Sequence, residues 1–415
     1  MELLRVATAG SVDDGKSTLI GRLLHDTKVL HDDVLDSIAA STEQRGGDGL
    51  DLALITDGLR AEREQGITID VAYRYFSTPR RSFIIADTPG HVQYTRNMVT
   101  GASTSDVAVI LVDARHGLKE QSHRHTCLSA MLGIHHLVLA VNKMDLVDWS
   151  RESFDAITDE FRSLVDGLGV TTVVAIPLCA LTGDNVVDPS PHTPWYTGPT
   201  LLDHLETLPI PLGATAGLRL PVQLVIKPSP GHAADATGTS GGQWKDRRWY
   251  AGSVASGMPM VGDEVIVLPA GTRTKIVAVE GNLPAVRVQL ADDLDVARGD
   301  VIAGIEDPPR AVDQVRARVA WMSDRPLTCG TSVLVKHATR TVRAVATALH
   351  DRLEVSDLTV HKGTTQLGLN EIGTVSFTTA GLLPFDPYEV NRTMGSFIII
   401  DPVTNATVGA GMVTS

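Results

Sequence analysis

Five short motifs in the N-terminal half constrain this chain more than any bulk property. They are GSVDDGKS at residues 10–17, a threonine at Thr68, DTPG at 87–90, NKMD at 142–145 and CAL at 179–181. A glycine-rich loop ending in Lys-Ser binds phosphates, whereas Asn-Lys-x-Asp presents a carboxylate that reads a guanine base. A phosphate loop alone can be a chance match, but phosphate and base recognition together indicate one ligand. The order of the motifs predicts a domain that binds and hydrolyses GTP.

The first motif is expected to form the phosphate seat. Gly10 and Gly15 let the backbone turn tightly, so that N–H groups and the start of the following helix face the phosphates. Lys16 places a point charge at the β- and γ-phosphates, and the Ser17 hydroxyl is expected to hold Mg²⁺. The other expected nucleotide contacts of this loop are Asp13, Asp14 and Thr18. The alternative is a glycine turn with an incidental lysine, and the four companion motifs argue against it.

The next two motifs are expected to face the γ-phosphate. Asp87 ends an apolar strand, where a carboxylate can hold Mg²⁺ through water, and Gly90 leaves a bare N–H for the γ-phosphate. Thr68 is a candidate second hydroxyl ligand of Mg²⁺. Spacing alone would make it an exposed strand threonine, but its place between the phosphate loop and Asp87 favours the metal role. Residues 61–68 should then be ordered with GTP and loosened after hydrolysis.

His91 directly follows Gly90, which would leave its imidazole near the water that attacks in line. The alternative is a surface histidine with satisfied hydrogen bonds. The expected catalytic group is His91, Lys16, Thr68 and Gly90. Packing or solvent roles are expected for the remaining histidines, among them His123, His125, His135 and His136, because they form no pattern of metal ligands.

The last two motifs are expected to bind the base. The Asp145 carboxylate can accept from the N1 and N2 donors of guanine together, a match that adenine cannot offer. Asn142 and Lys143 frame the ring, and the backbone N–H of Ala180 can reach the guanine oxygen. The base contacts of the final loop are expected from Cys179, Ala180 and Leu181.

Up to about residue 210, short apolar β-rich runs alternate with helical patterns. Predicted strands cover 3–9, 83–86, 107–112, 136–141 and 173–177, and predicted helices cover 16–25, 120–132, 152–168 and 201–208. This alternation predicts an α/β domain with a mostly parallel, doubly wound sheet, in which ligands bind beyond the carboxyl ends of the strands. The motifs follow such strands, which agrees with the predicted ligand.

The pattern of apolar and polar residues changes after residues 209–211, where helical periodicity largely vanishes. Short alternating strands are predicted at 222–226, 249–255, 264–268, 274–279 and 286–290, and then at 314–321, 332–337, 341–349, 373–378 and 396–400. Glycine-rich turns between them favour small closed β-barrels. We predict a GTP-binding domain over 1–211, a first antiparallel β-barrel over 212–308 and a second over 309–415.

Residues 228–246 are rich in Gly, Ala, Ser and Thr and nearly lack large apolar side chains. Such a segment cannot offset the entropy of ordering, so a mobile loop is predicted inside the first barrel. A solvated insertion is the simpler interpretation, and a partner contact is the alternative.

Net charge, cysteine content and hydropathy limit the partners and the cellular compartment that we expect for this chain. The formal net charge of −13 disfavours a broad basic face, so nucleic acid is not an expected partner, although a local basic patch can survive in an acidic protein. The cysteines Cys127, Cys179 and Cys329 form no Cys-x-x-Cys pair, which argues against a disulfide framework or a thiolate zinc site. The start has no signal-peptide pattern, and no apolar run approaches the roughly 18 residues of a membrane span. These features predict a soluble, cytoplasmic protein.

With the motifs assembled, the chain resembles the elongation-factor class of GTPases, through the His91-bearing DTPGH and a nucleotide domain followed by two barrels. Within that class it resembles the GTPase subunit of bacterial sulfate adenylyltransferase. Four strings carry this second resemblance: GSVDDGKSTLIGRLL from residue 10, TDGLRAEREQGITIDVAYRYF from 56, DTPGHVQYTRNMVTGAS from 87 and TPWYTGPTLL from 193. Asp14 stands where translation factors usually carry His, and Cys179 stands where the family commonly has Ser.

The resemblance implies a division of labour. A separate catalytic subunit would make adenosine 5′-phosphosulfate and pyrophosphate from ATP and sulfate, and this chain would hydrolyse GTP to drive that unfavourable step. It also implies a monovalent cation, K⁺, associated with Asp13 beside the phosphates. Some relatives carry a fused adenylylsulfate kinase; no second phosphate loop precedes Ser415, so the subunit stands alone or the chain is a piece of a longer one.

Two other functions share the same motifs. A translation elongation factor would deliver aminoacyl-tRNA and use GTP hydrolysis as a timer, and an acidic net charge does not exclude it because a tRNA surface can be local. An assembly or signalling GTPase with another partner is the third alternative.

Overall fold

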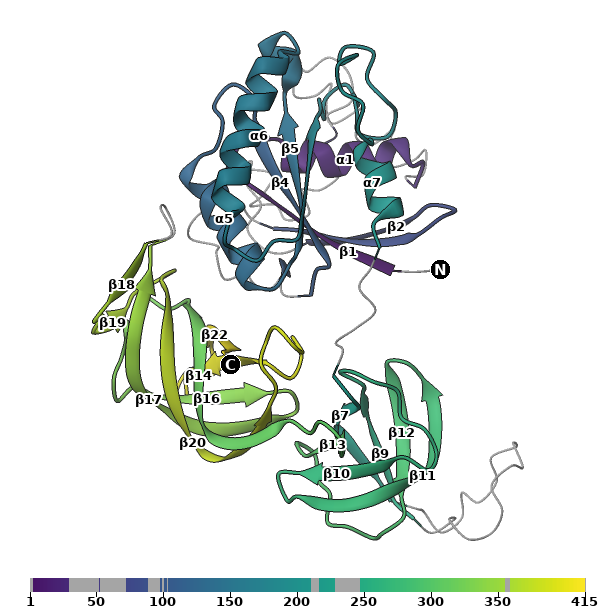
Figure 1. The fold of residues 1–415 in the computed structure, drawn as a ribbon, viewed down its shortest axis with the longest axis vertical. Coiled ribbons are helices and arrows are strands. Elements are labelled where there is room, and N and C mark those ends of the chain that lie inside the picture. The colour runs from purple at the N-terminus through teal and green to yellow at the C-terminus, as the bar shows by residue number, and fades with distance from the viewer. Residues whose placement is uncertain are drawn as a thin grey trace. The chain divides into compact units, whose positions relative to one another are not determined.

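The computed structural model describes residues 3–29, 52, 72–88, 98, 101–102, 104–209, 216–227, 247–354 and 359–414. The chain divides after Pro211 into two compact units (Figure 1). The segment 228–246, for which a mobile loop is predicted, lies outside the described residues. No helix in the described part of the chain has the length and apolar character needed to cross a membrane.

The first unit is built on a six-stranded sheet in the order β2-β3-β1-β4-β5-β6 (Figure 1). Its strands are β1 (Leu3–Gly10), β2 (Ala72–Ser77), β3 (Ser82–Asp87), β4 (Val107–Asp113), β5 (His136–Asn142) and β6 (Thr172–Pro177). All neighbouring pairs are parallel except β2 with β3, which is antiparallel at the edge. Every residue of β4 is buried, because helices cover both faces of the sheet.

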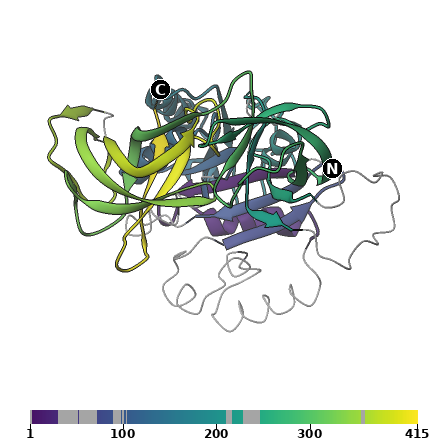
Figure 2. The same ribbon diagram turned by 90° about the horizontal axis from the view of Figure 1, so that it is seen from below.

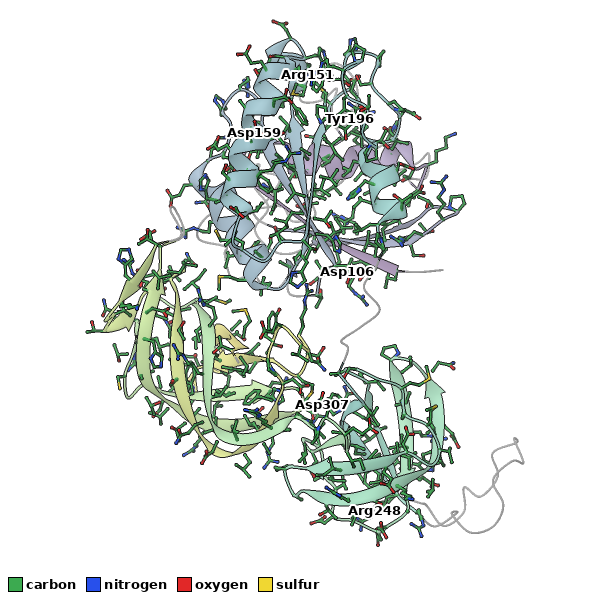
Figure 3. All side chains as sticks on the ribbon, viewed as in Figure 1. Asp106, Arg151, Asp159, Tyr196, Arg248 and Asp307 are labelled. Carbon is green, nitrogen blue, oxygen red and sulfur yellow. The ribbon has the colours of Figure 1, made fainter. Side chains whose placement is uncertain are left out.

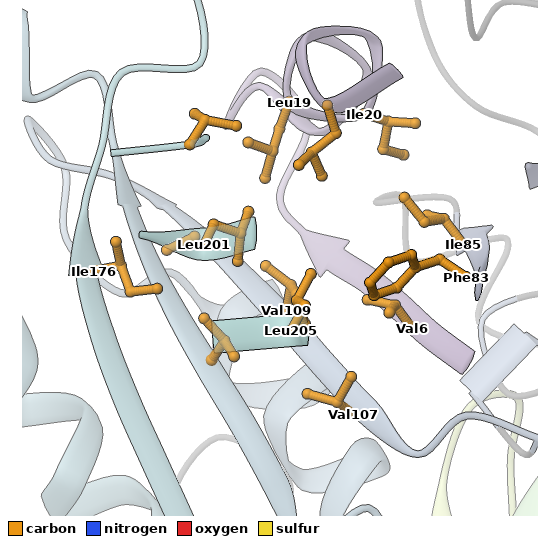
Figure 4. Packing of buried hydrophobic residues seen from close by; sticks show 14 of the residues in the cluster. Val6, Leu19, Ile20, Phe83, Ile85, Val107, Val109, Ile176, Leu201 and Leu205 are labelled. Atoms are coloured by element: carbon orange, nitrogen blue, oxygen red, sulfur yellow. The ribbon is translucent and has the colours of Figure 1, made fainter. Parts of the chain in front are cut away.

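The helices of the first unit divide between the two faces. They are α1 (Lys16–Asp26), α5 (Glu120–Met131), α6 (Arg151–Val165), α7 (Leu201–Thr207) and the 3₁₀ helix η3 (Met144–Val147). Helices α1 and α7 share one core with the sheet, in which Leu19 and Leu201 lie near Val109 (Figure 4). The apolar positions of α1 recur at helical spacing, which explains why this face of the helix is buried. On the other face, α5 packs on β1 and β4, and α6 packs on β5 and β6.

The second unit begins with a sheet that closes on itself. Its order is β7-β13-β10-β11-β12-β9-β8, and each pair is antiparallel. The strands are β7 (Arg219–Pro221), β8 (Leu224–Ile226), β9 (Trp249–Ser253), β10 (Glu264–Leu268), β11 (Thr272–Asn282), β12 (Ala285–Leu290) and β13 (Val301–Gly304). Because β7 and β8 follow one another in the chain and form opposite ends of the sheet, the sheet forms a small barrel.

The strand predicted at 222–226 is wrong in its extent. The structure places β7 before it and keeps only Leu224–Ile226 as β8. The chain changes partners between them: the N–H of Val222 donates to Asp300 O, and the N–H of Gln223 donates to Ala251 O on the other side. A period-two sequence pattern does not record such a change of neighbour.

A second barrel follows, in the order β16-β21-β22-β14-β20-β17-β18, and pairing of β16 with β17 closes six of these strands. The strands are β14 (Arg310–Trp321), β16 (Ser332–His337), β17 (Arg340–Leu353), β18 (Val360–Lys362), β20 (Ile372–Phe385), β21 (Ser396–Ile400) and β22 (Thr407–Val413); β15 (Leu327–Thr328) and β19 (Gln366–Leu367) form a separate pair. The curved yellow-green strands of this barrel are clear in Figure 2. The predicted fold class, an α/β domain with a mostly parallel sheet followed by two small antiparallel β-barrels, is confirmed.

A buried ion pair joins the two barrels within the second unit. Arg219, 1% exposed, donates from Nε to Asp386 Oδ2 at 3.0 Å and from Nη2 to Asp386 Oδ1 at 3.1 Å. The same guanidinium donates to the backbone oxygen of Asp307, which is labelled in Figure 3. Two parallel hydrogen bonds of this kind give a guanidinium and a carboxylate the partners that they need away from water.

Candidate nucleotide-binding site

The described motif residues meet at one edge of the parallel sheet. β1 ends at Gly10, β3 at Asp87 and β5 at Asn142, and the register pairs Thr8 with Asp87 and Asp113 with Asn142. Parallel strands end at the same edge, which is where ligands of such sheets bind. Three further predicted site residues, Thr68, Gly90 and His91, lie outside the described residues, as does the predicted switch segment 61–68.

The loop between β1 and α1 has a backbone that its glycine makes possible. Gly15 has φ +96°, and a Cβ there would lie 2.4 Å from Asn142 Nδ2. A side chain at this position would therefore push the base motif away from the loop. Lys16 Nζ donates to Gly10 O at 3.1 Å and to Ser11 O at 3.0 Å, so the loop curls around the ammonium group.

Lys16 is buried, and its charge is balanced by carboxylates. Burial lowers the pKa of this lysine, while the negative charges of Asp87, Asp14 and Asp13 act in the opposite direction. Asp87 is 1% exposed at the end of β3. The electrostatic field at the loop therefore combines a buried cation with carboxylates, an arrangement that can hold a nucleotide phosphate together with a divalent cation.

Asp14 braces the loop from inside. Its Oδ2 accepts from the N–H of Ser11 at 2.7 Å, and its Oδ1 lies 3.1 Å from Lys119 Nζ at the start of α5. Asp14 is 1% exposed, whereas Lys119 is partly exposed. Lys119 was not among the sequence-predicted site residues. No local pattern reveals it, because the pairing depends on α5 packing against β1 and β4.

Asn142 connects the phosphate loop, residues 10–17, with the loop after β6 that carries Cys179, Ala180 and Leu181. This second loop, residues 179–183, is called the base loop. Its Nδ2 donates to Asp14 O at 2.8 Å, and its Oδ1 accepts from the N–H of Ala180 at 2.9 Å. The N–H that is predicted to reach the guanine oxygen is thus already bonded, so a bound base would share it with Asn142 or compete for it. The side chain therefore sets where that N–H points.

Lys143 is held by a network that includes two further residues outside the prediction. Its Nζ donates to Asp13 O and lies 3.0 Å from Asp113 Oδ2. Arg115 donates to Asp113 through Nε at 3.0 Å and through Nη2 at 2.7 Å. Burial alone would raise the pKa of Asp113, but the hydrogen bonds from Arg115 and Lys143 lower it well below its usual range. Asp113 is thus a charged anchor for Lys143 at the end of β4.

Asp145, in η3, has an oxygen that lacks a donor in the described structure. Oδ1 is buried and has no hydrogen-bond partner among the described residues. A carboxylate oxygen buried in this way fits a ligand that brings N–H donors. Beside it, burial raises the pKa of the Cys179 thiol, and the Asp145 carboxylate raises it further, so the thiol stays protonated.

The residues expected to hold Mg²⁺ fit that role in chemical type. Ser17 is half-buried in the first turn of α1, and Asp87 is buried at the end of β3. A hydroxyl and a carboxylate are oxygen donors of the kind that Mg²⁺ prefers. Thr18 lies next to Ser17 in the same turn and is also half-buried.

Comparison with known proteins places the chain in a family. Residues 1–211 match the family described as elongation factor Tu GTP binding domain, and residues 314–414 match the GTP-eEF1A C-terminal domain-like family. The bifunctional enzyme CysN/CysC of Mycobacterium tuberculosis (strain ATCC 25618 / H37Rv) is 56% identical over 99% of this chain and 67% of that protein. Among solved structures, Sup35 complexed with GMPPNP covers 100% of this chain and 94% of that one, with 24% identity and a TM-score of 0.41.

Two further relatives share a name. Sulfate adenylyltransferase subunit 1 of Bacteroides fragilis (strain YCH46) is 48% identical over 99% of this chain and 86% of that protein. Sulfate adenylyltransferase subunit 1 of Shewanella oneidensis is 46% identical over 100% of this chain and 85% of that protein. The identity extends through the nucleotide domain and both barrels. The chain therefore belongs to the sulfate adenylyltransferase subunit 1 family, within the class that carries the elongation factor Tu GTP-binding domain.

Proposed function

We propose that this chain hydrolyses GTP as one subunit of a sulfate adenylyltransferase. Its hydrolysis would drive a separate catalytic subunit that forms adenosine 5′-phosphosulfate and pyrophosphate from ATP and sulfate. The observation that carries the proposal is identity of 45–56% with the curated relatives over nearly the whole chain, together with a guanine-binding motif at the carboxyl edge of the sheet. The substrates ATP and GTP fit a cytoplasmic complex.

Selection of GTP over ATP is proposed to rest on Asp145 and the Ala180 loop. The Asp145 carboxylate, whose buried Oδ1 has no donor among the described residues, would accept from N1–H and N2–H of guanine. Adenine has no hydrogen at N1 and no 2-amino group, so it would leave this carboxylate oxygen unpaired, which is costly in a buried site. Asn142 would keep the Ala180 N–H near the guanine oxygen.

Phosphate binding is proposed to rest on Lys16, Ser17 and the glycine loop. Lys16 would neutralise the β- and γ-phosphates, and Ser17, Asp87 and Thr68 would hold Mg²⁺. The ion supplies positive charge at the γ-phosphate during transfer to water. The Gly90 N–H would contact the γ-phosphate, and His91 would orient the attacking water.

Asp13 is proposed to attract a monovalent cation, K⁺, beside the phosphates. Asp13 is exposed, and its negative charge acts on Lys16 in the phosphate loop, so a carboxylate accessible to a cation lies beside the phosphate site. Identical GTP turnover in potassium and sodium buffers would contradict this part of the proposal.

A reconstitution tests the function as a whole. The intact chain is mixed with the catalytic subunit of a sulfate adenylyltransferase, ATP, sulfate, Mg²⁺ and GTP, and both products are measured. We expect adenosine phosphosulfate in proportion to the GTP consumed, and none of this extra product with a non-hydrolysable GTP analogue. Tight binding of aminoacyl-tRNA without any coupled product would favour the translation-factor alternative instead.

A further inference from the structure

An arginine on α1 reaches across to the base loop. Arg22 Nε donates to Ala180 O at 3.2 Å, and its Nη2 donates to Leu181 O. Ala180 and Leu181 lie 158 and 159 positions after Arg22 in the sequence. α1 is the helix that begins at Lys16, so one rigid element carries both the phosphate-binding lysine and a donor to the base loop.

The base loop lies close against this helix. A Cβ added at Gly183 would lie 3.3 Å from Asp26 Oδ2 and 3.4 Å from Arg22 Cδ. Gly183 also has φ +94°, a backbone conformation that favours glycine. The close approach and the hydrogen bonds are separate observations, and both show that residues 180–183 rest on α1.

Ala180 is thereby held from both sides. Its N–H donates to Asn142 Oδ1, and its carbonyl accepts from Arg22. The Arg22 guanidinium holds the carbonyls of Ala180 and Leu181, and so fixes the two peptide groups that follow the Ala180 N–H. The direction of that N–H depends on the orientation of these peptide groups. Loss of Arg22 would remove the two hydrogen bonds from α1 to the Ala180 and Leu181 carbonyls and leave the Asn142 hydrogen bond at the Ala180 N–H.

The arginine is itself oriented by its own helix. Arg22 Nη1 lies 3.4 Å from Asp26 Oδ1, one turn further along α1, and the His25 ring lies 2.7 Å from the same oxygen. The Arg22 side chain is only 17% exposed. A guanidinium presents several donors in one rigid plane, which suits two carbonyls and a carboxylate at once, whereas a lysine ammonium cannot span that set.

We propose that Arg22 is a positioning residue for guanine selectivity: by holding the Ala180 and Leu181 carbonyls, it fixes the Ala180 N–H for the base while leaving phosphate binding to other residues. This inference rests on the proposed function, in which the loop reads guanine. It predicts that removing the guanidinium weakens discrimination between bases and spares the affinity for phosphates.

The experiment compares three ligands on the intact, magnesium-supplied protein by calorimetry: GDP, ADP and inorganic tripolyphosphate. The variants are Arg22→Met, which keeps the aliphatic stem, and Arg22→Lys, which keeps the charge. Arg151→Ala is a surface control, because Arg151, labelled in Figure 3, forms an i,i+4 pair with Asp155 on α6 in which both side chains are exposed. Melting temperatures are recorded for each variant.

For Arg22→Met we expect the ratio of GDP to ADP affinity to fall about tenfold, the usual effect of losing hydrogen bonds from a charged donor. Tripolyphosphate affinity should stay within about twofold, which also shows that the variant is folded. Arg22→Lys should have the melting temperature of the wild type but only part of its GDP-to-ADP affinity ratio. Arg151→Ala should have both the melting temperature and the affinity ratio of the wild type.

Three results would overturn the inference. The first is an unchanged GDP-to-ADP ratio in Arg22→Met, and the second is an equal loss for tripolyphosphate and GDP. Full recovery of the ratio in Arg22→Lys is the third. A wild-type protein that binds GDP and ADP equally would remove the proposed function as well, so failure of the function is distinguishable from failure of the Arg22 role.

Discussion

Lys119 Nζ lies 3.1 Å from Asp14 Oδ1, although 105 positions separate the two residues in the sequence. The pair connects the phosphate loop to the N-terminus of α5. Asp14 is buried and also accepts from the N–H of Ser11, so the position of the loop backbone depends on a carboxylate whose charge is balanced by the partly exposed ammonium of Lys119 and by the nearby Lys16.

Replacing Lys119 with methionine should weaken nucleotide binding. The buried carboxylate would lose a cation while negative phosphates approach, and we expect GTP affinity to fall several-fold and the free energy of unfolding to drop by about 1 kcal/mol. Calorimetry and urea unfolding measure the two effects. Lys275→Met, which removes an exposed partner of Glu264 in the first barrel, is the control. Wild-type affinity in Lys119→Met would show that the pair is only structural.

Asp145→Asn should change which base is bound. The substitution replaces an acceptor with a donor at one oxygen, which suits the 2-oxo group of xanthine and opposes the 2-amino group of guanine. Affinity for GTP should fall about a hundredfold or more relative to xanthosine triphosphate. A competition assay with both nucleotides measures the ratio, and retained GTP selectivity would remove Asp145 from base recognition.

His91→Ala should separate binding from hydrolysis. Orientation of the attacking water contributes to the barrier and not to ground-state binding, so we expect unchanged nucleotide affinity and single-turnover hydrolysis slowed by roughly tenfold or more. His135→Ala is a suitable control, because His135 lies at the opposite end of β5 and contacts Gly169 O. Hydrolysis at the wild-type rate would exclude His91 from the mechanism.

The stability of the second unit should depend on the ion pair between Arg219 and Asp386. In Asp386→Asn the buried Arg219 keeps its charge but loses the carboxylate, and we expect the second unit to be destabilised by about 3–5 kcal/mol. Asp293→Asn is the control, since Asp293 is 80% exposed beside Arg248, the residue labelled at the rim of the first barrel in Figure 3. Equal urea midpoints for the two variants would contradict this expectation.

Acid should destabilise the second unit through His337. Burial lowers its pKa to about 4, although Nε2 donates to Met394 O at 2.9 Å. The unfolded chain takes up a proton near pH 6.5 while the folded ring stays neutral, so the stabilising difference is complete above that pH and is lost as the pH falls toward 4. At pH 5 the loss is about 2 kcal/mol. Urea unfolding of the wild type and His337→Gln at pH 7 and 5 measures it; equal pH dependence would contradict the assignment.

The sequence predicted the helices and the central strands well because their signals are local. The predicted helix over 16–25 is α1, Lys16–Asp26, and the predicted strand over 107–112 is β4, Val107–Asp113. The predicted list omits the edge strand β2 and the four-residue β13. β13 is too short for a period to stand out, whereas β2 has six residues but lies at the edge of the sheet and buries little of its surface, so it lacks the apolar run that marks the central strands.

The site was predicted in part for the same reason. The roles of Gly15 and Lys16 can be predicted because both belong to a motif of eight consecutive residues, 10–17. Lys119 and Arg115 do not belong to any motif. Arg22 falls inside a recognisable string, but its partner carbonyls at Ala180 and Leu181 emerge only when α1 and the loop after β6 meet at one edge of the sheet.

Motif order, residue chemistry and strand–helix alternation were thus determined by the sequence itself, because each is written over a few consecutive residues. The tertiary structure decided the pairing of Asp14 with Lys119, of Arg22 with the Ala180 loop and of Arg219 with Asp386. Those contacts join positions 105 to 167 residues apart. Their existence follows from which strands lie side by side and which helices cover them, and burial then makes each charge depend on the partner that the fold supplies.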